Sequence, residues 1–566
     1  MIPRKKIGQH FLTFNLKDFR MVNQFVKEIT CGAGSARTWN GASSYASIGT
    51  AMLDQFAKAG SARGRAVEDV FADMGRLWAE NPDYALKFPF YLRMVTRKAK
   101  MFGGNVTDAV QRGQGVRDEA FKRLLWLALY QPDVFYQNLW VLPIVGSWKD
   151  LWVLLSMSDD LQKERFFEVI AKGINDEYHR ELVKKYLPRI RANGKCKTSW
   201  AKKSNALAKE FCKYVGWSPK EYRSFKSTGM AHEFQRVICG RLYDALNFNT
   251  IPGKALLNLV SGNFLDNHNL TEKYLEWIKS QPVAKFVGYP YELAVKVEGN
   301  MWNLPLTTKI TIDKQFDNLI KTAKEDGGAI KGNVWCAMDR SGSMTDRVSS
   351  DSNLMVRTVC FALGVYFSTL NEGAFHKNVV LFDDESKSFQ LQGDFTDMYQ
   401  QVSRAPGGMG STNFQSVIDE MIRIRKSKPE IPVSDFPETL LVVSDMQFNK
   451  TGKYPWDQTE EDITTEEDEK TNFELAKAKL REVFPEEFVD NFKVVWWQVN
   501  AKTTDFPSNM DCGGTYNISG FDGSIVSFLL GGETVVDPQT GEKRVATMEE
   551  IIDKALNQEA LSVLSL

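Results

Sequence analysis

The sequence predicts a chain in two parts, an α-helical repeat array followed by an α/β domain with a doubly wound sheet. Apolar residues recur at helical spacing through the first 325 residues. Beyond them, strand-like apolar runs alternate with helical segments, which is typical of a parallel sheet built from βαβ units. We therefore expect a helical region over residues 1–328 and an α/β domain over residues 329–566.

The helical region consists of segments separated by short Pro, Gly or Asn punctuation. The clearest segments are 44–59, 66–80, 118–129, 149–156 and 161–172. Many helices with short connections are typical of HEAT-like pairs that stack into an array, which can close into a ring. No fixed repeat period is visible, so this prediction depends on the lengths of the helices and of their connections.

The α/β domain is expected to start after the glycines at 327–328. Its strand candidates are 334–338, 378–382, 438–444 and 492–499, and its helix candidates are 353–370, 414–426 and 472–483. An acidic insertion covers about 454–470. We interpret it as a solvated surface loop. The alternative is that it competes electrostatically with an anionic ligand for the basic half of the chain.

Oxygen-bearing side chains follow two of the strand candidates. Asp339 ends the run 334–338, and Ser341 and Ser343 come next at a spacing of two. Parallel strands place such residues at the carboxyl edge of a sheet, where α/β folds bind ligands. One carboxylate and two hydroxyls suit a hard cation such as Mg²⁺.

This Asp-x-Ser-x-Ser pattern resembles the metal-ion-dependent adhesion site of von Willebrand A domains. In that family a loop threonine and a later aspartate complete the site, and Thr412 and Asp445 occur in the matching order. The resemblance implies that Ser341, Ser343 and Thr412 contact Mg²⁺, or another divalent cation such as Mn²⁺, directly. It implies that Asp339 and Asp445 act partly through water. Met446 stands where many relatives carry glycine.

Two alternatives to a binding site are open. The serines after Asp339 could merely cap a helix in an α/β domain without a ligand. Catalysis is the other alternative, because a cation held by hydroxyls and carboxylates can support phosphoryl chemistry. The chain has no phosphate-loop lysine motif, no metal-ligand spacing among its five histidines and no nucleophile elbow. We therefore expect a binding protein and not an enzyme.

Composition favours a soluble intracellular protein. No apolar run is long enough to span a membrane, and the N-terminus Met-Ile-Pro-Arg-Lys-Lys has no signal core. The seven cysteines are scattered without Cys-x-x-Cys pairs, which argues for a reducing compartment and against structural zinc. We expect the cytoplasm, or the host-cell cytoplasm if the protein is viral.

A net charge of zero conceals a strong asymmetry. Residues 1–330 hold 49 Lys and Arg against 33 Asp and Glu, and the remainder holds 22 against 38. The most basic window is 180–226, with fourteen Lys and Arg, three Glu and several interleaved aromatic residues. Cations neutralise phosphates and aromatic faces stack on unpaired bases, so this window is a candidate RNA-binding surface. The alternatives are an ordinary charged helix surface and aromatic residues that belong to the core.

Eight residues are the candidate RNA contacts in this window. They are Lys184, Lys185, Arg189, Arg191, Lys195, Lys197, Lys202 and Lys203.

The whole arrangement resembles the Ro autoantigen family, in which a helical ring of the TROVE class precedes an A domain. Several stretches are more similar to a Ro-related family found in plants, fungi, bacteria and viruses. They are 112–119, 142–151, 185–189, 222–225, 494–499 and 518–522. The resemblance implies binding of structured or single-stranded RNA by the helical region. A metal-dependent adaptor for a protein with an acidic residue, or a viral assembly component, remains the alternative.

Overall fold

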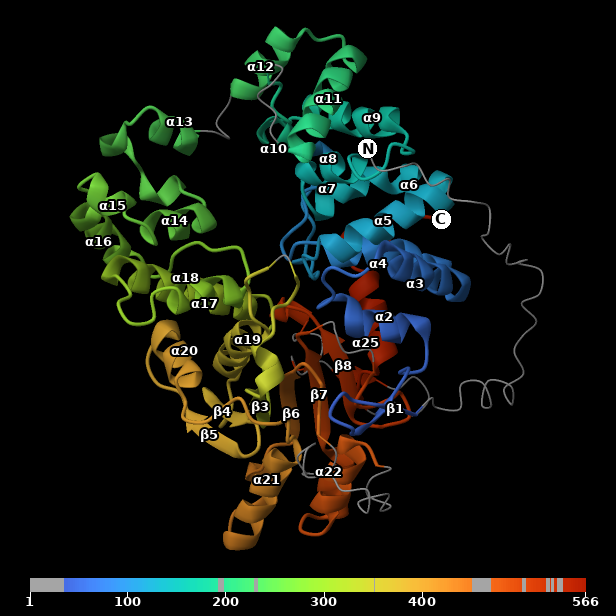
Figure 1. Cartoon of the computed structure of the whole chain (residues 1–566), viewed down its shortest axis with the longest axis vertical. Helices are drawn as coiled ribbons and strands as arrows, with labels where there is room; N and C mark the ends of the chain where they lie inside the picture. Colours follow the sequence, from blue (N-terminus) through green and yellow to red (C-terminus); the bar gives the residue numbers. More distant parts are fainter. Residues whose placement is uncertain are drawn as a thin grey trace.

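The computed structural model describes residues 35–566 except 192–197, 229–232, 351, 450–469, 501–504, 526–529, 531–533 and 537–542. Nearly all of the predicted acidic insertion at 454–470 therefore lies outside the described residues. Figure 1 shows a helical arc at the top and an α/β domain below it. The helix-rich first part and the α/β second part confirm the coarse division that the sequence predicts.

Most helices of the arc follow one another with short connections, and a longer segment, 94–117, separates α4 from α5. In chain order they are α2 (Ala51–Ala59), α3 (Val67–Glu80), α4 (Pro82–Arg93), α5 (Asp118–Tyr130), α6 (Pro132–Asn138), α7 (Leu142–Val145), α8 (Trp148–Leu155), α9 (Lys163–Asn175), α10 (Arg180–Tyr186), α11 (Ser199–Tyr214), α12 (Pro219–Ser227), α13 (Glu233–Cys239), α14 (Gly253–Val260), α15 (Phe264–Asn267), α16 (Thr271–Ser280), α17 (Pro290–Glu298) and α18 (Leu306–Glu325).

Local sequence explains where many of these helices begin and which face they bury. The Asn81 side chain caps α4 by accepting from the Tyr84 N–H at 3.1 Å, and Pro82 occupies the first helical position. In α3 the buried residues Val70, Met74 and Leu77 recur at helical spacing.

A six-stranded sheet forms the centre of the second part. Its strands are β3 (Val334–Asp339), β4 (Asn378–Phe382), β5 (Ser386–Gln390), β6 (Thr439–Ser444), β7 (Lys493–Gln498) and β8 (Thr515–Ser519). They lie in the order β5-β4-β3-β6-β7-β8. The four predicted strands are confirmed as β3, β4, β6 and β7.

The prediction of a wholly parallel sheet is wrong at one edge, where β5 runs antiparallel to β4. The sequence of β5, Ser-Lys-Ser-Phe-Gln, is polar and largely exposed because it is an edge strand, so it carries no apolar run.

Helices cover both faces of the sheet. Cys336 and Met338 face the core that contains α19 (Val356–Leu370), whereas Trp335 and Ala337 face α21 (Gln415–Ser427) and α22 (Asn472–Arg481). This alternation along β3 is the pleat of a strand buried on both sides. The remaining helices of this part are α20 (Phe395–Ser403) and α23 (Glu486–Asn491).

The helix predicted at 44–59 starts later than expected, because its first residues belong to a β-hairpin. Strands β1 (Ser35–Arg37) and β2 (Ser43–Tyr45) precede α2. The hairpin packs on the α/β domain, where the Tyr45 N–H donates to the Phe506 carbonyl at 2.8 Å. These partners are remote in the sequence, so the local helical pattern at 44–59 could not reveal the hairpin.

The C-terminal helices extend the contact between the two parts. After a small hairpin of β9 (Thr534–Val536) and β10 (Lys543–Val545) come α25 (Met548–Leu556) and α26 (Glu559–Ser562). The Tyr84 hydroxyl on α4 donates to Asp553 at 2.8 Å, and the Lys87 ammonium donates to Asn557 at 2.7 Å. The end of the chain thus packs on the beginning of the helical arc.

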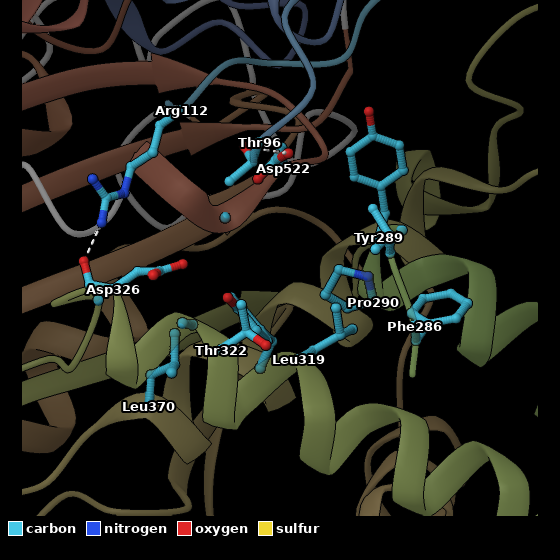
Figure 2. A pocket seen from close by; sticks show the side chains of 16 residues that line it. Thr96, Arg112, Phe286, Tyr289, Pro290, Leu319, Thr322, Asp326, Leu370 and Asp522 are labelled. Carbon is cyan, nitrogen blue, oxygen red and sulfur yellow. Dashed lines mark hydrogen bonds between the residues drawn. The ribbon is translucent and has the colours of Figure 1, made fainter. Parts of the chain in front are cut away.

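The arc also curves back on itself. Its early loop contacts its last helices, since Arg112 donates to the Asp326 carbonyl and the Tyr289 hydroxyl donates to the Gln114 carbonyl. A cavity of about 130 Å³ lies at this junction. Figure 2 shows Arg112 and Asp326 on one side of it and Tyr289 and Phe286 on the other. Asp522, from the loop after β8, also lines the cavity, so three regions of the chain meet there.

No described helix is both long and apolar enough to cross a bilayer.

Candidate functional site

Adjacent parallel strands deliver the first ligand candidates to one edge of the sheet. β3 pairs in parallel with β6, with Met338 opposite Val443, so Asp339 and Ser444 end their strands side by side. One carboxylate oxygen of Asp339 accepts from the Ser341 N–H at 2.8 Å. The other accepts from the Ser444 hydroxyl at 2.6 Å. These two bonds fix the orientation of a carboxylate that is completely buried.

The two serines and the second aspartate complete the side of the site formed by β3 and β6. The hydroxyl oxygens of Ser341 and Ser343 lie 3.3 Å apart. The Ser343 side chain is hydrogen-bonded to Asp445, which also accepts from the Gln447 N–H at 3.2 Å. Asp445 is 1% exposed.

The glycine-rich loop brings Thr412 to the same place. The Met409 N–H donates to the Arg340 carbonyl at 3.1 Å, and the Gly342 N–H donates to the Gly410 carbonyl at 2.9 Å. On its other side, Thr412 exchanges hydrogen bonds with Asn449, whose amide oxygen accepts from the Thr412 N–H. The structure therefore brings the three segments that carry the ligand candidates together at one edge of the sheet.

The electrostatics of this edge suit a cation. Burial, with a further contribution from the nearby Asp445, raises the pKa of Asp339 to about 7. Burial also raises the pKa of Asp445. The guanidinium of Arg340 pairs with Asp383 at 3.2 Å, so its charge is directed toward β4. A bound divalent cation would relieve the repulsion between the two buried carboxylates.

The donor set is all oxygen, which fits Mg²⁺ or Mn²⁺ better than a soft metal. Two aspartates, two serines and one threonine would hold the ion. The described residues contain no group of three or more His, Cys, Asp or Glu side chains placed to bind a metal. This site has only two carboxylates, and its other candidate ligands are hydroxyls.

Met446, which follows the second aspartate, adopts the left-handed conformation with φ of 63°. Glycine reaches this region without strain, whereas a methionine there is strained. The side chain is 3% exposed and packs in the core against the sheet, which compensates for the strain.

Met409 in the glycine-rich loop has the same conformation, with φ of 68°, but its side chain is 71% exposed. Met409→Gly removes the strain without losing a packed side chain. We expect it to raise the free energy of unfolding by about 1 kcal/mol or less. Met510→Gly is the matched control, because Met510 is also exposed (54%) but is not among the residues with positive φ. Urea denaturation of both variants measures the effect, and a loss of stability in Met409→Gly would refute it.

Sequence reasoning missed a neighbour of the metal-site candidates, the N-terminal β1–β2 hairpin. Its Thr38 hydroxyl donates to the Phe448 carbonyl at 2.6 Å, and its Trp39 N–H donates to the Gln447 side chain at 2.7 Å. Trp39 is 91% exposed. The hairpin thus places an exposed indole beside the segment that follows Asp445. No local sequence pattern could have found a contact between residues about four hundred positions apart.

The basic window folds into α10, α11 and α12, which lie together at the top of the arc in Figure 1, between α9 and α13 along the chain. On α11, Lys202, Lys209 and Lys213 are exposed and fall along one side of the helix. The opposite side of α11 is buried through Ala208 and Phe211. Exposed basic residues continue on both sides of α11. They are Lys185, Arg189 and Arg191 before it, and Lys220 and Arg223 after it.

The eight candidate RNA contacts differ in their surroundings. Lys185, Arg189, Arg191 and Lys202 are exposed. Lys203 is exposed too, but its ammonium contacts Asp159 and the Ser156 carbonyl. Lys184 is only 9% exposed and pairs with Glu181 at 2.7 Å. Lys195 and Lys197 lie outside the described residues.

Most aromatic residues of the window belong to the core. Tyr222 and Phe211 are fully buried, and Trp217 packs against Phe225 with ring centroids 5.0 Å apart. Trp200 and Tyr214 are the exposed members among the described residues, at 41% and 46%.

Lys226 is a partly buried lysine beside the exposed basic residues. Its ammonium donates to the carbonyls of Lys184 and Lys185, and burial together with Arg189 lowers the pKa of Lys226 to about 8. A neighbouring polyanion would favour the charged form of this group.

Comparison with known proteins finds a matching family and a similar protein. Residues 334–565 match the family described as "Domain of unknown function (DUF7788)". The matched region begins at the first residue of β3 and covers less than half of the chain. The chain is also similar to "Uncharacterized protein L728" of Acanthamoeba polyphaga mimivirus, with 22% identity over 547 residues. That alignment covers 88% of this chain and 84% of the viral protein.

Proposed function

We propose that this chain is a non-catalytic RNA-binding protein of the Ro type, whose HEAT-like helical region binds RNA on the exposed basic surface of α10–α12. The observation that carries the proposal is the row of exposed lysines on α11, extended by Arg189 and Arg191. Such a row neutralises successive phosphates and releases their counterions. The proposed contacts are Lys185, Arg189, Arg191, Lys202, Lys209 and Lys213. Lys184 is left out because it is buried and paired with Glu181.

The second half of the proposal is a von Willebrand A-type domain with a metal-ion-dependent adhesion site. The sheet order, the helices on both faces and the edge position of Asp339 support it. Mg²⁺, when bound, supplies an electrophilic site for a carboxylate of a protein partner. The Ser341 N–H and the Ser444 hydroxyl hold Asp339 in place, and Ser343 is hydrogen-bonded to Asp445. This arrangement binds a partner without chemistry. We place the protein in the cytoplasm.

A metal-dependent adaptor or assembly component without RNA binding is the second candidate. The exposed Trp39 and Met409 beside the metal-site residues favour it, because exposed apolar side chains around a polar centre are typical of protein interfaces. The two candidates differ in whether nucleic acid binds.

The first test is the preference for RNA over DNA. We expect a structured RNA with a free single-stranded end to displace a fluorescent RNA from the protein at lower concentration than duplex DNA of equal charge does. Phosphate contacts alone treat both polymers alike, whereas unpaired bases and 2′-hydroxyls offer further contacts. Competition titrations monitored by fluorescence anisotropy measure the preference. Purified protein with an absorbance spectrum free of nucleic acid, combined with no binding at low salt, would favour the adaptor.

A further inference from the structure

An open cleft lies where the end of α17 meets the beginning of α19 and the end of α20. Its volume is about 680 Å³. The loop between α17 and α18 forms one wall and contributes Asn300, Trp302 and Asn303. Met355 and Arg357, at the start of α19, form another. The cleft is separate from the metal-site residues and from the basic surface on α10–α12.

Trp302 is the most distinctive side chain of this cleft, because 90% of it is exposed. The guanidinium of Arg404, which follows α20, lies over its ring at 4.8 Å from the centroid. Arg404 also donates to the Met301 carbonyl at 2.5 Å. These two contacts hold the indole from one side, and its high exposure leaves the other face open to a ligand.

The cleft has one acidic and one basic side chain in its lining and a second basic side chain at its rim. Its acidic member, Glu298, accepts hydrogen bonds from the Thr358 hydroxyl at 3.0 Å and from the Tyr399 hydroxyl at 2.6 Å. These bonds direct the Glu298 carboxylate toward the protein. Arg357 in the lining and Arg404 at the rim remain as cations. An exposed aromatic ring, with one arginine in the lining and one at the rim of the same cleft, matches a planar ring that carries an anion.

We propose that this cleft binds one unpaired nucleotide of an RNA strand. The base stacks on the open face of Trp302, Arg404 supports the opposite face of the indole, and Arg357 holds an adjoining phosphate. The side-chain amides of Asn300 and Asn303 offer donors and acceptors to the edge of the base. The proposal deepens the proposed RNA-binding function and depends on it. It assigns single-strand recognition to a site other than the basic surface on α10–α12.

The test uses the full-length protein and a short fluorescein-labelled single-stranded RNA. We expect Trp302→Ala to weaken its binding by about tenfold or more, because stacking of one base on one aromatic side chain contributes that much. Trp302→Phe keeps an aromatic face and should restore most of the affinity. Trp39→Ala is the matched control, since Trp39 is equally exposed (91%) and lies beside the metal-site residues. We expect it to change nothing.

A second variant tests the phosphate contact. Arg357→Ala should weaken binding of the short RNA and reduce its dependence on salt, while binding of duplex RNA to the basic surface stays unchanged. Thermal melting of each variant verifies the fold. We expect the Trp302 substitutions to leave the fold intact because this side chain is exposed.

The outcomes separate this proposal from the proposed function. If structured RNA binds but Trp302→Ala holds the short RNA as tightly as wild type, the cleft proposal fails and the basic surface stands. If neither RNA binds, both proposals fail. A third outcome is that a poly-glutamate peptide quenches the tryptophan fluorescence of wild type but not that of Trp302→Ala, while the short RNA quenches neither. The cleft then binds acidic protein, and the nucleotide proposal is overturned.

Discussion

Replacing Asp339 with asparagine will abolish the thermal stabilisation of the protein by Mg²⁺. A ligand that binds the folded state alone stabilises it by about 2.7 kcal/mol at a hundredfold excess over its dissociation constant. The asparagine amide is uncharged and holds a divalent cation much more weakly than a carboxylate does, so this gain should disappear. The substitution keeps the oxygen that accepts from the Ser341 N–H, and its amide group can donate to the Ser444 hydroxyl. The fold should therefore survive.

In the absence of metal, the same substitution should not lower the stability of the protein. Because burial raises the pKa of Asp339 to about 7, the ionised carboxylate costs stability in the metal-free protein. That cost grows as the pH rises from the ordinary aspartate pKa through the raised one. At pH 8 and without Mg²⁺, we expect the variant to melt at a temperature no lower than wild type.

Differential scanning fluorimetry with and without Mg²⁺ measures both effects. Asp384→Asn is the matched control, because Asp384 lies at the same edge and accepts from the Ser411 N–H at 2.7 Å without belonging to the proposed ligands. It should retain the response to Mg²⁺. Equal stabilisation of wild type and Asp339→Asn by Mg²⁺ would rule out the proposed metal site.

Removing four positive charges from the basic surface will cause the largest loss of RNA affinity. The variant replaces Arg189, Arg191, Lys202 and Lys209 with alanine. Lys203, also on α11, is kept because its ammonium contacts Asp159. If each side chain neutralises one phosphate, their combined loss lowers the affinity by about 10³-fold at 0.1 M salt. All four are exposed, so the fold should be unaffected.

A matched variant separates this local effect from the general loss of charge. It replaces the exposed residues Lys279, Lys285, Lys426 and Lys428, which lie outside the basic window. It removes the same number of charges and should bind RNA almost as tightly as wild type. Asp339→Asn should also leave RNA affinity nearly unchanged. Similar losses in the two charge-removal variants would show that no specific surface binds the RNA.

The sequence was most informative where local pattern and function coincide. The apolar run before Asp339 predicts a buried strand that ends at a polar loop, and β3 has this form. The runs that end near Asp445 and the glycine-rich loop before Thr412 likewise depend on neighbouring residues alone. Parallel pairing of β3 with β6 then places the ends of these strands together. The position of the metal-site candidates could therefore be predicted from where the strands end and from their order in the chain.

Counting charges along the sequence identified the basic window but could not predict which of its lysines and arginines are exposed. Lys184 and Lys185 are neighbours in the sequence, yet one is buried against Glu181 and the other is exposed. Which residue faces inward depends on how α12 packs on α10, with the Lys184 ammonium 5.0 Å from the Phe225 ring centroid. A count of charges in a window carries no information on such packing.

Features made by distant segments could not be predicted. The β1–β2 hairpin is held by residues near 447 and 506, and the cleft at Trp302 combines a loop of the helical arc with α19. Neither arrangement leaves a periodic signal, because each depends on contacts formed only when the two parts of the chain pack together. Trp39 and Trp302 look like ordinary core residues in the sequence, and only the structure shows them exposed.

A salt titration of RNA binding decides whether the basic surface on α10–α12 holds RNA. The affinity of wild type and of the Arg189, Arg191, Lys202 and Lys209 variant for one fluorescent RNA is measured across a range of KCl concentrations. We expect a steep linear fall of log affinity with log salt for wild type. For the variant we expect a slope smaller in magnitude by about 3, at roughly 0.7 to 0.9 for each lost phosphate contact. Equal slopes, or no binding by wild type at low salt, would contradict the claim that this surface binds RNA.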